Sequence, residues 1–468
     1  MGTIKGIWGV KGKKLGCFIA RYIEQGKKTL QMASVRYGKD LSGFDMVFCF
    51  AFYCLLLVFF PTEPPDDLLR HMKAYTYGYD YRQMWPFSPG LPSFNMYYLF
   101  DVFSGAVHHA LGPNSFVFIQ LLAVTLYAVA IYWLLQGASS RNWRFTLMMI
   151  ILSLVLFRIV LARPATFESG LFLLALAACN ENRVKWWMHF ILGCIIACFY
   201  HLFFIYLIPL AIYRRAYMGS LVCGISGWFT YAGTEYFHTI KSAMTIDSHR
   251  AGLIVAESQP IWHAFLPTLF IIIPVLFYWQ KDVRRLLVSG WFLLSNRMRY
   301  IEVLSPALAS YAKHWDVKLS QLTVSVIVIS LCFYRPVTHL EDSWIALKGV
   351  VPPGSRVLCL HSDPMYKMVY ANDSLKLSPC MDAGWDTDDI KEAIRMACES
   401  GKLYRKVLLS GKYEFVVENN LKEIPQGLSL YKISGKYRIW RVPTPFGLPT
   451  GNAAAFEGHG EKKCPGKS

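Results

Sequence analysis

Long runs of apolar residues, separated by short polar turns, extend over the first three quarters of the chain. An α-helix of about 20 apolar residues crosses the hydrocarbon core of a bilayer. The runs expected to cross it are residues 44–60, 116–135, 145–161, 167–178, 221–231, 261–279 and 319–334. Their close spacing predicts a polytopic α-helical membrane protein rather than a soluble protein with many buried helices.

Three stretches depart from this simple pattern. Residues 186–213 are too long for one span, and we expect two short helices with His201 at the turn between them. Residues 94–111 are aromatic but contain Asp101 and two histidines, which favours an interfacial or partly inserted helix. Residues 286–318 fit either a short helical hairpin or a re-entrant element on the inner side.

Composition agrees with a membrane protein: 54% of the residues are hydrophobic, whereas only 17% are charged, below the usual quarter for a soluble domain. The net charge of +17 would indicate a nucleic-acid partner in a soluble protein. Here the basic residues cluster beside apolar runs, so the positive-inside rule accounts for most of them and no nucleic-acid partner is expected.

The distribution of Lys and Arg also predicts the orientation. Residues 1–43 are strongly basic and read as a cytoplasmic segment on anionic lipid, not as a cleaved signal peptide. The first span, at the start of the 44–338 transmembrane domain, then leads outward. Counting crossings places residues 61–96, 163–168 and 233–259, together with His201, on the outer side.

The last quarter changes character. Alternating runs at 356–360 and 413–417 predict strands, and Asp386 to Asp389 precede an amphipathic helix. We therefore expect a small extracytoplasmic α/β domain over residues 339–445, followed by a disordered tail over 446–468. No paired CxxC motif occurs, and Cys359, Cys380 and Cys398 allow one disulfide with one thiol left over.

The richest candidate chemistry lies in the first outer loop, residues 61–96, where Asp66 and Asp67 follow two prolines. Adjacent carboxylates repel, which raises one pKa and makes one of them a candidate general base. The other would hold an acceptor hydroxyl or a divalent metal. The alternative is structural: both acids would favour the start of a helix by charge. The two interpretations are compatible.

Cationic and aromatic residues surround this pair and recur at later helix ends. Arg163 is a candidate for gripping a phosphate, although it could instead pair with Glu168. His201 is a candidate ligand contact or a buried packing residue. The tyrosines between residues 75 and 81 suit either an interfacial aromatic belt or stacking on a sugar.

The basic start, the single span, the acidic first outer loop and the C-terminal α/β domain with Pro352-Pro353-Gly354 together resemble the GT-C superfamily of integral-membrane glycosyltransferases. The resemblance implies a bacterial inner-membrane enzyme with a cytoplasmic N-terminus and a periplasmic C-terminal domain. It implies a polyprenyl-phosphate sugar donor, a glycan, lipid or protein acceptor, and no certain cofactor. The lipid tail of the donor would lie in a groove between spans.

Mapped onto this sequence, the resemblance implies a role for each candidate. Asp66 or Asp67 would be the catalytic base. The donor phosphate would be bound by Arg70, His71, Arg82, Arg163 and His201. Further substrate contacts would come from Lys73, Tyr77, Tyr79, Asp80, Tyr81, Glu168 and Arg250.

Other classes stay open. A polysaccharide polymerase or ligase acting on polyprenyl-diphosphate glycans would concentrate its basic residues in two large middle loops. A transporter would carry charges near the bilayer midplane and internal repeats. A non-enzymatic subunit of an envelope assembly would tolerate loss of Asp66 and Asp67.

Overall fold

The computed structural model describes residues 67–138, 141–179, 184–245, 282–294, 300–314, 343–379, 386–419 and 427–443, with Ala51, Glu181 and Leu421. The chain is mostly helical with one small sheet, and it divides into two compact units. The first contains residues 1–80, 92–248 and 254–339, and the second contains residues 81–91, 249–253 and 340–468.

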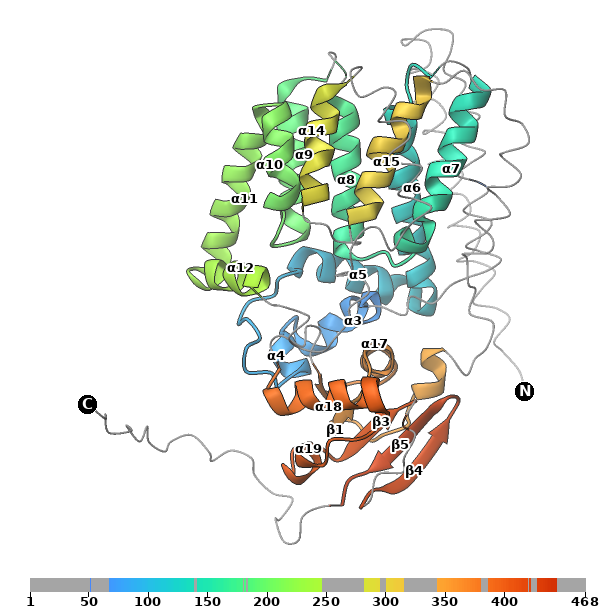
Figure 1. Cartoon of the computed structure of the whole chain (residues 1–468). Helices are drawn as coiled ribbons and strands as arrows, with labels where there is room; N and C mark the ends of the chain where they lie inside the picture. The colour runs from blue at the N-terminus through green and yellow to red at the C-terminus, as the bar shows by residue number, and fades with distance from the viewer. Residues whose placement is uncertain are drawn as a thin grey trace, which may run out of the picture. The chain divides into compact units, whose positions relative to one another are not determined.

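The helical unit consists of helices that run side by side (Figure 1). They are α6 (Ser115–Leu134), α7 (Arg141–Ile159), α8 (Pro164–Cys179), α9 (Trp186–Phe199), α10 (Phe204–Tyr213), α11 (Ala216–Ala232), α14 (Val283–Leu294) and α15 (Ile301–Ala309). α6 packs closely on α8, and α9 packs on α11. Glycines allow these approaches: a Cβ on Gly170 would lie 2.7 Å from the Leu126 side chain, and one on Gly193 would lie 2.4 Å from Oγ of Ser220.

Successive helices run in opposite directions, so their connections alternate between two ends of the unit. At one end, α3 (Leu68–Lys73), η1 (Ala74–Tyr77), α5 (Tyr98–Leu111), η2 (Gly112–Asn114) and α12 (Glu235–Thr245) lie across the ends of the long helices (Figure 1). We call this the α3–α5 end. α3 packs on α5, and its Leu68, Leu69 and Met72 are buried.

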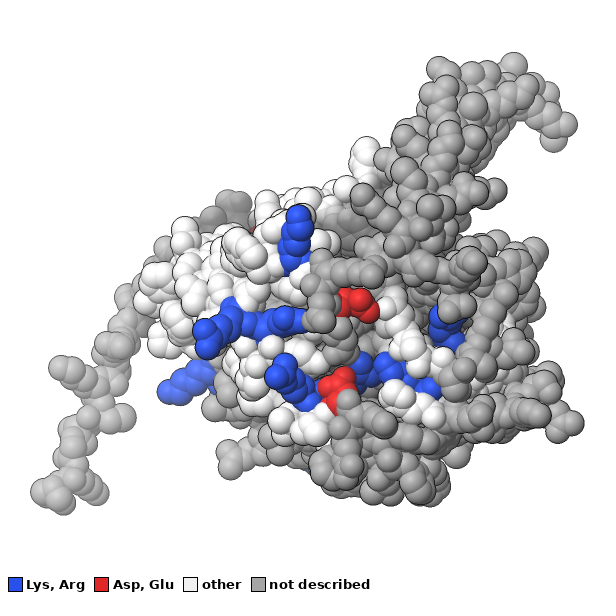
Figure 2. Space-filling view, turned by 90° about the horizontal axis from the view of Figure 1, so that it is seen from above, with Lys and Arg blue, Asp and Glu red and all other residues white. Residues whose placement is uncertain are grey.

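The opposite end is rich in Lys and Arg. Lys185, Arg214 and Arg215 flank α9, α10 and α11 at this end, and Arg284 lies in the first turn of α14. Seen from this side, basic side chains spread over the described surface with few carboxylates between them (Figure 2).

The structure bears on several of the predicted elements. The helices expected at 94–111, 116–135, 145–161, 167–178 and 221–231 are present with shifted bounds. The long run 186–213 is divided into α9 and α10 with His201 at the turn, as predicted. Within residues 286–318, α14 packs on α15 and α15 contacts η7 (Ser310–His314), so the short hairpin and the re-entrant element both stay open.

The structure has a helix that the sequence did not predict: α12 occupies the first half of the predicted outer loop 233–259. It forms because Tyr236 is fully buried and anchors an amphipathic helix next to α11. The predicted segments 1–43, 44–60, 261–279, 319–334 and 446–468 lie outside the described residues, apart from Ala51.

Among the described residues, one helical stretch is long and apolar enough to cross a bilayer. It is Tyr98–Leu134, which combines α5, η2 and α6 and has a mean hydropathy of 2.1 over its most apolar window. Shorter apolar helices are α8, α9 and α10. A single stretch of this kind also fits the core of a soluble protein, so the number of spans stays a prediction.

The second unit is an α/β domain built on a five-stranded sheet of order β2-β1-β3-β5-β4. The strands are β1 (Arg356–Cys359), β2 (Lys376–Ser378), β3 (Phe415–Glu418), β4 (Ser429–Ser434) and β5 (Tyr437–Arg441). β1 pairs in parallel with β2 and β3, and β5 pairs antiparallel with β3 and β4. The strands predicted at 356–360 and 413–417 correspond to β1 and β3.

Helices complete this domain: η9 (Trp344–Leu347), α17 (Ser362–Ala371), α18 (Asp388–Ser400) and α19 (Arg405–Leu409). Ala393 and Ala397 of α18 pack with Leu358, Val416 and Trp440 of the sheet. The short α4 (Tyr81–Met84) packs on β2, so residues 81–91 of the predicted outer loop belong to this unit. Cys359 is a buried free thiol, which leaves only the other two cysteines for the predicted disulfide.

Candidate functional site

The site forms where α3 begins. Asp67 is the residue before the helix, and its carbonyl oxygen accepts hydrogen bonds from the N–H groups of Arg70 and His71 at 3.0 and 3.2 Å. Because a helix repeats every 3.6 residues, the side chains three and four positions later return to the side of Asp67. Leu68, Leu69 and Met72 of the same helix are also buried.

Three charged or titratable groups consequently meet in a nearly dry environment. Nη2 of Arg70 lies 2.8 Å from Oδ2 of Asp67, and Nε2 of His71 lies 3.5 Å from the same oxygen. The Arg70 side chain is 1% exposed and that of His71 is fully buried, whereas that of Asp67 is 14% exposed. The Asp67 side chain is thus the most exposed of the three, although its Oδ1 is buried.

The charge of Asp67 is set by this environment. Burial alone would raise the pKa of its carboxyl, but Arg70, followed by His71 and Arg163, holds that pKa well below its ordinary value. Asp67 is therefore ionised at neutral pH. The contribution of Arg163 also shows that the residue before α8 lies close enough to act on the Asp67 charge.

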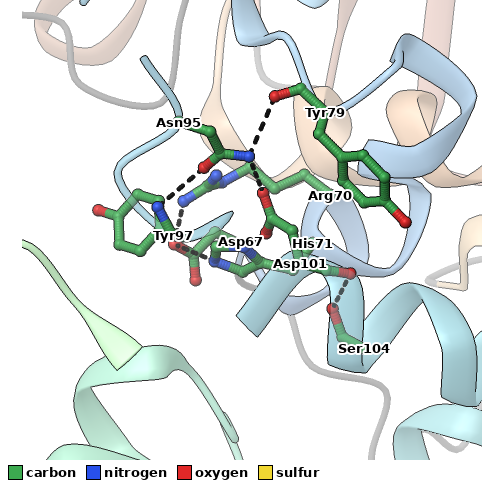
Figure 3. Close-up of polar contacts among 8 residues, drawn as sticks. All are labelled: Asp67, Arg70, His71, Tyr79, Asn95, Tyr97, Asp101 and Ser104. Atoms are coloured by element: carbon green, nitrogen blue, oxygen red, sulfur yellow. Dashed lines mark hydrogen bonds and ion pairs between the residues drawn. The ribbon is translucent and has the colours of Figure 1, made fainter. Parts of the chain in front are cut away.

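A second carboxylate lies behind the imidazole. Oδ1 of Asp101, in the first turn of α5, contacts Nδ1 of His71 at short distance, and both side chains are fully buried. Nδ2 of Asn95 donates to Oδ2 of Asp101 at 2.6 Å and to the carbonyl oxygen of Tyr79 at 3.1 Å. Oδ1 of Asn95 accepts from the backbone N–H of Tyr97 at 2.8 Å. His71 is held between two carboxylates (Figure 3).

Tyr97 joins this cluster to the turn between α9 and α10. Its ring lies 4.9 Å from the Arg70 guanidinium carbon and is stacked on Tyr200 with centroids 5.1 Å apart. The rings of His71 and His201 meet it edge-on, at 5.0 and 6.1 Å. The structure thereby brings His201 next to the Asp67 cluster, as the sequence predicted.

Two buried titratable side chains nearby, His201 and Glu168, make no side-chain hydrogen bond to the described residues. His201 is 2% exposed; its carbonyl oxygen accepts a hydrogen bond from the Tyr236 hydroxyl, and no described residue bonds its ring nitrogens. Glu168 is fully buried in α8, and its carboxylate accepts no hydrogen bond from any described residue. The alternative in which Arg163 pairs with Glu168 is therefore not observed.

The remaining predicted site residues are more scattered. Tyr77 is buried, whereas Lys73, Tyr79 and Asp80 are half-buried in the same loop. Tyr81 and Arg82 belong to the second unit, where Arg82 donates to the carbonyl oxygen of Leu91 at 3.4 Å. Asp66 and Arg250 lie outside the described residues, so their roles stay predictions.

An apolar groove of about 270 Å³ lies between α5, α9 and α11. Its lining combines small residues, including Ala197, Gly224 and Gly227, with the aromatic Tyr98, Trp228 and Tyr231. The Tyr98 ring meets Tyr79 edge-on at 5.7 Å, so the groove adjoins the loop that carries the cluster.

The sequence analysis missed Asn95 and Tyr97 and treated Asp101 only as an interruption in an aromatic stretch. That interruption was the available signal, because an acid inside an apolar helix is costly unless it has a partner. Within the described part of the chain, no three His, Cys, Asp or Glu side chains are grouped so as to hold a metal ion. The divalent-metal alternative, which involves Asp66, stays untested.

No protein-family model matches this chain, and no characterised protein matches it by sequence. The resemblance to the GT-C superfamily therefore depends on the motifs quoted above.

Proposed function

We propose that the chain is a GT-C-like membrane glycosyltransferase that moves a sugar from a polyprenyl-phosphate donor to an extracytoplasmic glycan, lipid or protein. The observation that carries the proposal is the convergence of Asp67, Arg70 and Arg163 at one end of the helical unit, beside an apolar groove. A donor of this class needs a base, cations for its phosphate and an apolar surface for its lipid.

Two features of the helical unit support placing it in a bilayer. Trp186, Trp187, Ile191 and Ile195 on α9, and Val222 on α11, are all more than a third exposed. Exposed apolar side chains in such number are typical of a lipid-facing or partner-facing surface. The basic end opposite the cluster is what the positive-inside rule expects of a cytoplasmic face, with the cluster then on the outer side (Figure 2).

In the proposed reaction, an oxygen of the acceptor attacks the anomeric carbon while the bond from that carbon to the donor phosphate breaks. The proton of the acceptor hydroxyl passes to Asp67, and the electron pair of the broken bond leaves with the polyprenyl phosphate. Arg70 and Arg163 stabilise the charge that develops on the phosphate. Direct displacement of this kind inverts the anomeric configuration.

The ion pair between Asp67 and Arg70 makes the strength of the base depend on whether the donor is bound. A carboxylate held by a guanidinium is a weak base. When the Arg70 guanidinium pairs with the donor phosphate, its ion pair with Asp67 weakens. The pKa of Asp67 then rises, and Asp67 becomes a better base. Binding of the donor would thus activate the base. We do not assign His71 to the phosphate, because its two ring nitrogens face carboxylates.

The test replaces Asp67 by Asn in cells that depend on the protein, with analysis of envelope glycans and lipid-linked sugars. General-base catalysis contributes on the order of 100- to 10,000-fold, so we expect loss of the glycan product and accumulation of the lipid-linked donor. Asp388→Asn is the matched control, because that carboxylate is exposed on α18 of the other unit. Normal glycans from Asp67→Asn at normal protein level would contradict the proposal.

Orientation has its own test. Tyr75 is exposed in the loop after α3, so a membrane-impermeant thiol reagent should label Tyr75→Cys in intact cells. The unsubstituted protein provides the background from the native cysteines. Labelling that requires broken cells would place the cluster on the cytoplasmic side and exclude an extracytoplasmic acceptor.

A further inference from the structure

A second apolar groove, of about 240 Å³, lies between α6, α8 and α9. Its lining includes Trp133 in the last turn of α6, Ala178 in the last turn of α8 and Trp187 in the first turn of α9, and it extends along α9 to Ile195. Because Lys185 directly precedes α9, these turns belong to the Lys- and Arg-rich end of the helical unit. We call this cavity the α6–α9 groove.

The α6–α9 groove suits a hydrocarbon chain better than a soluble ligand. Aliphatic and indole side chains dominate its lining, and its volume is below the roughly 300–1,000 Å³ of pockets that hold soluble small molecules. The α9 helix that borders it also exposes apolar side chains, including Trp186, Ile191 and Ile195. Exposed apolar surface of this kind is typical of contact with lipid or a partner.

Cationic groups gather at the end of the groove beside the first turn of α9. Lys185 is exposed, and its side chain does not cap the helix. The first N–H groups of a helix have no partner within it, and the helix dipole favours an anion there. Arg214 donates to the carbonyl oxygen of Cys179, the last residue of α8, at 2.8 Å. The nearest acid in the sequence, Glu181, interacts electrostatically with Lys313. This end therefore complements a negatively charged group.

A buried polar side chain lies at the same end. His189, one turn after Lys185, lines the groove and is 3% exposed. Its Nδ1 lies 3.0 Å from the Tyr217 hydroxyl of α11, so its Nε2 points away from α11, and no described residue bonds Nε2. Buried polar atoms nearly always have a hydrogen-bond partner. A headgroup that can both donate and accept would provide one for either tautomer of the ring.

We infer that the α6–α9 groove binds one anionic glycerophospholipid, with an acyl chain along α9 and the phosphate beside Lys185 and the first turn of that helix. Headgroup hydroxyls, as in phosphatidylglycerol, meet Nε2 of His189. The bound lipid contacts three helices at once and stabilises their packing. The inference requires the helical unit to lie in a bilayer, but it does not depend on glycosyl transfer at the Asp67 cluster.

The first experiment is native mass spectrometry of the full-length protein after delipidation in detergent. The protein is titrated with phosphatidylglycerol or with phosphatidylcholine of the same acyl chains. We expect one phosphatidylglycerol to bind roughly 10-fold more tightly, because only this lipid carries a net negative charge. Equal affinities for the two lipids would overturn the inference. A dimer that excludes the lipid would also overturn it, by showing that a second copy covers this face.

The second experiment separates the groove from general attraction to a basic surface. Lys185→Glu places a negative charge beside the first turn of α9, and we expect the affinity for phosphatidylglycerol to fall by roughly 10-fold. Arg284→Glu is the matched control, because Arg284 is exposed at the same end on α14, which does not line the groove. It should leave the affinity nearly unchanged. Equal losses in the two variants would overturn the inference.

The third experiment tests the acyl chain. Ile191 lines the groove, so we expect Ile191→Trp to fill it and to abolish the preference for phosphatidylglycerol. Val222→Trp is the control, because Val222 is equally exposed on α11 and lies outside the lining. Phosphatidylglycerol should raise the Tm of Val222→Trp and of the unsubstituted protein, but not that of Ile191→Trp. Unchanged binding by Ile191→Trp would place the lipid elsewhere and refute the site.

These outcomes are distinct from those that test the proposed function. An active Asp67→Asn would refute glycosyl transfer by this cluster and leave the lipid site standing. Loss of lipid selectivity in the unsubstituted protein, with Asp67→Asn inactive, would refute the lipid site alone.

Discussion

Two buried polar clusters in the helical unit have similar groups and different construction. The first, with Asp67, Arg70, His71 and Asp101, sits on a short helix, a loop and the start of α5. The second lies among the long helices: Oγ of Ser169 in α8 donates to Oε1 of Glu302 in α15 at 3.0 Å and contacts the Tyr206 hydroxyl of α10 at 3.1 Å. Nε of Arg158, in α7, lies 3.9 Å from Oε2 of Glu302.

The difference shows how burial alone fails to identify a reactive site. The polar groups of the second cluster contact one another across four helices, so we expect this cluster to stabilise the packing of those helices. In the first cluster, Asp67 keeps part of its side chain exposed, with an imidazole and a second carboxylate next to it. We expect substitutions in the first cluster to change the chemistry, and substitutions in the second to change the stability.

After Asp67→Asn, the largest expected effect is on turnover in Arg70→Gln. Removing a cation that stabilises the leaving phosphate costs roughly 100- to 1,000-fold in kcat, as for other preorganised donors to developing negative charge. Arg214→Gln is the control at the opposite end, where the guanidinium bonds the Cys179 carbonyl oxygen. Steady-state kinetics with purified protein measure both. Equal losses in the two variants would show that the effect is one of folding.

The second expected effect is on stability in Glu302→Gln. The amide oxygen can keep the Ser169 hydrogen bond, but Arg158 loses its nearby countercharge in an apolar surrounding. We expect a loss of about 1–3 kcal/mol in the free energy of unfolding, measured by thermal denaturation in detergent, with kcat per folded molecule unchanged. A large loss of kcat at normal stability would make this cluster a second functional site.

A third prediction concerns pH. The folded-state pKa of Asp67 is lowered, so this carboxylate stays ionised at pH values at which an ordinary aspartate takes up a proton. Its stabilising interaction with Arg70 is present above the pKa of the unfolded chain and is lost as pH falls through the folded-state pKa. The acidic limb of the rate profile should move to higher pH in Arg70→Gln. An unmoved limb would show that Asp67 is not the titrating base.

The smallest effect expected is at Tyr97. Tyr97→Phe keeps the stack on Tyr200 and the contact with Arg70, and should change the free energy of unfolding little. Tyr97→Leu removes both interactions, each worth about 0.5–1.5 kcal/mol. Comparing the two variants by thermal denaturation isolates the contribution of the aromatic ring. Equal stability of both would mean that Tyr97 does not hold the turn at His201 against α3.

Helices and strands could be predicted where a periodic pattern extends over many residues, as in α6, α9, α10, β1 and β3. α12 escaped prediction because the burial of Tyr236 is visible only in the fold. The acidic motif, Arg163 and His201 were identified because charge beside apolar runs is unusual. The partner of His71 could not be found, since Asp101 lies thirty residues away and nothing local encodes that contact.

The backbone of Tyr79 has a consequence for attempts to stabilise this protein. Gly78 and Tyr79 adopt successive left-handed conformations, with φ of 60° and 61°, and a residue with a Cβ is disfavoured there by about 1–2 kcal/mol. Glycine at position 79 would relax this corner while deleting the ring that meets Tyr98 beside the groove. If Tyr79→Gly raises the thermal stability, it should therefore also lower the affinity for an amphiphilic ligand.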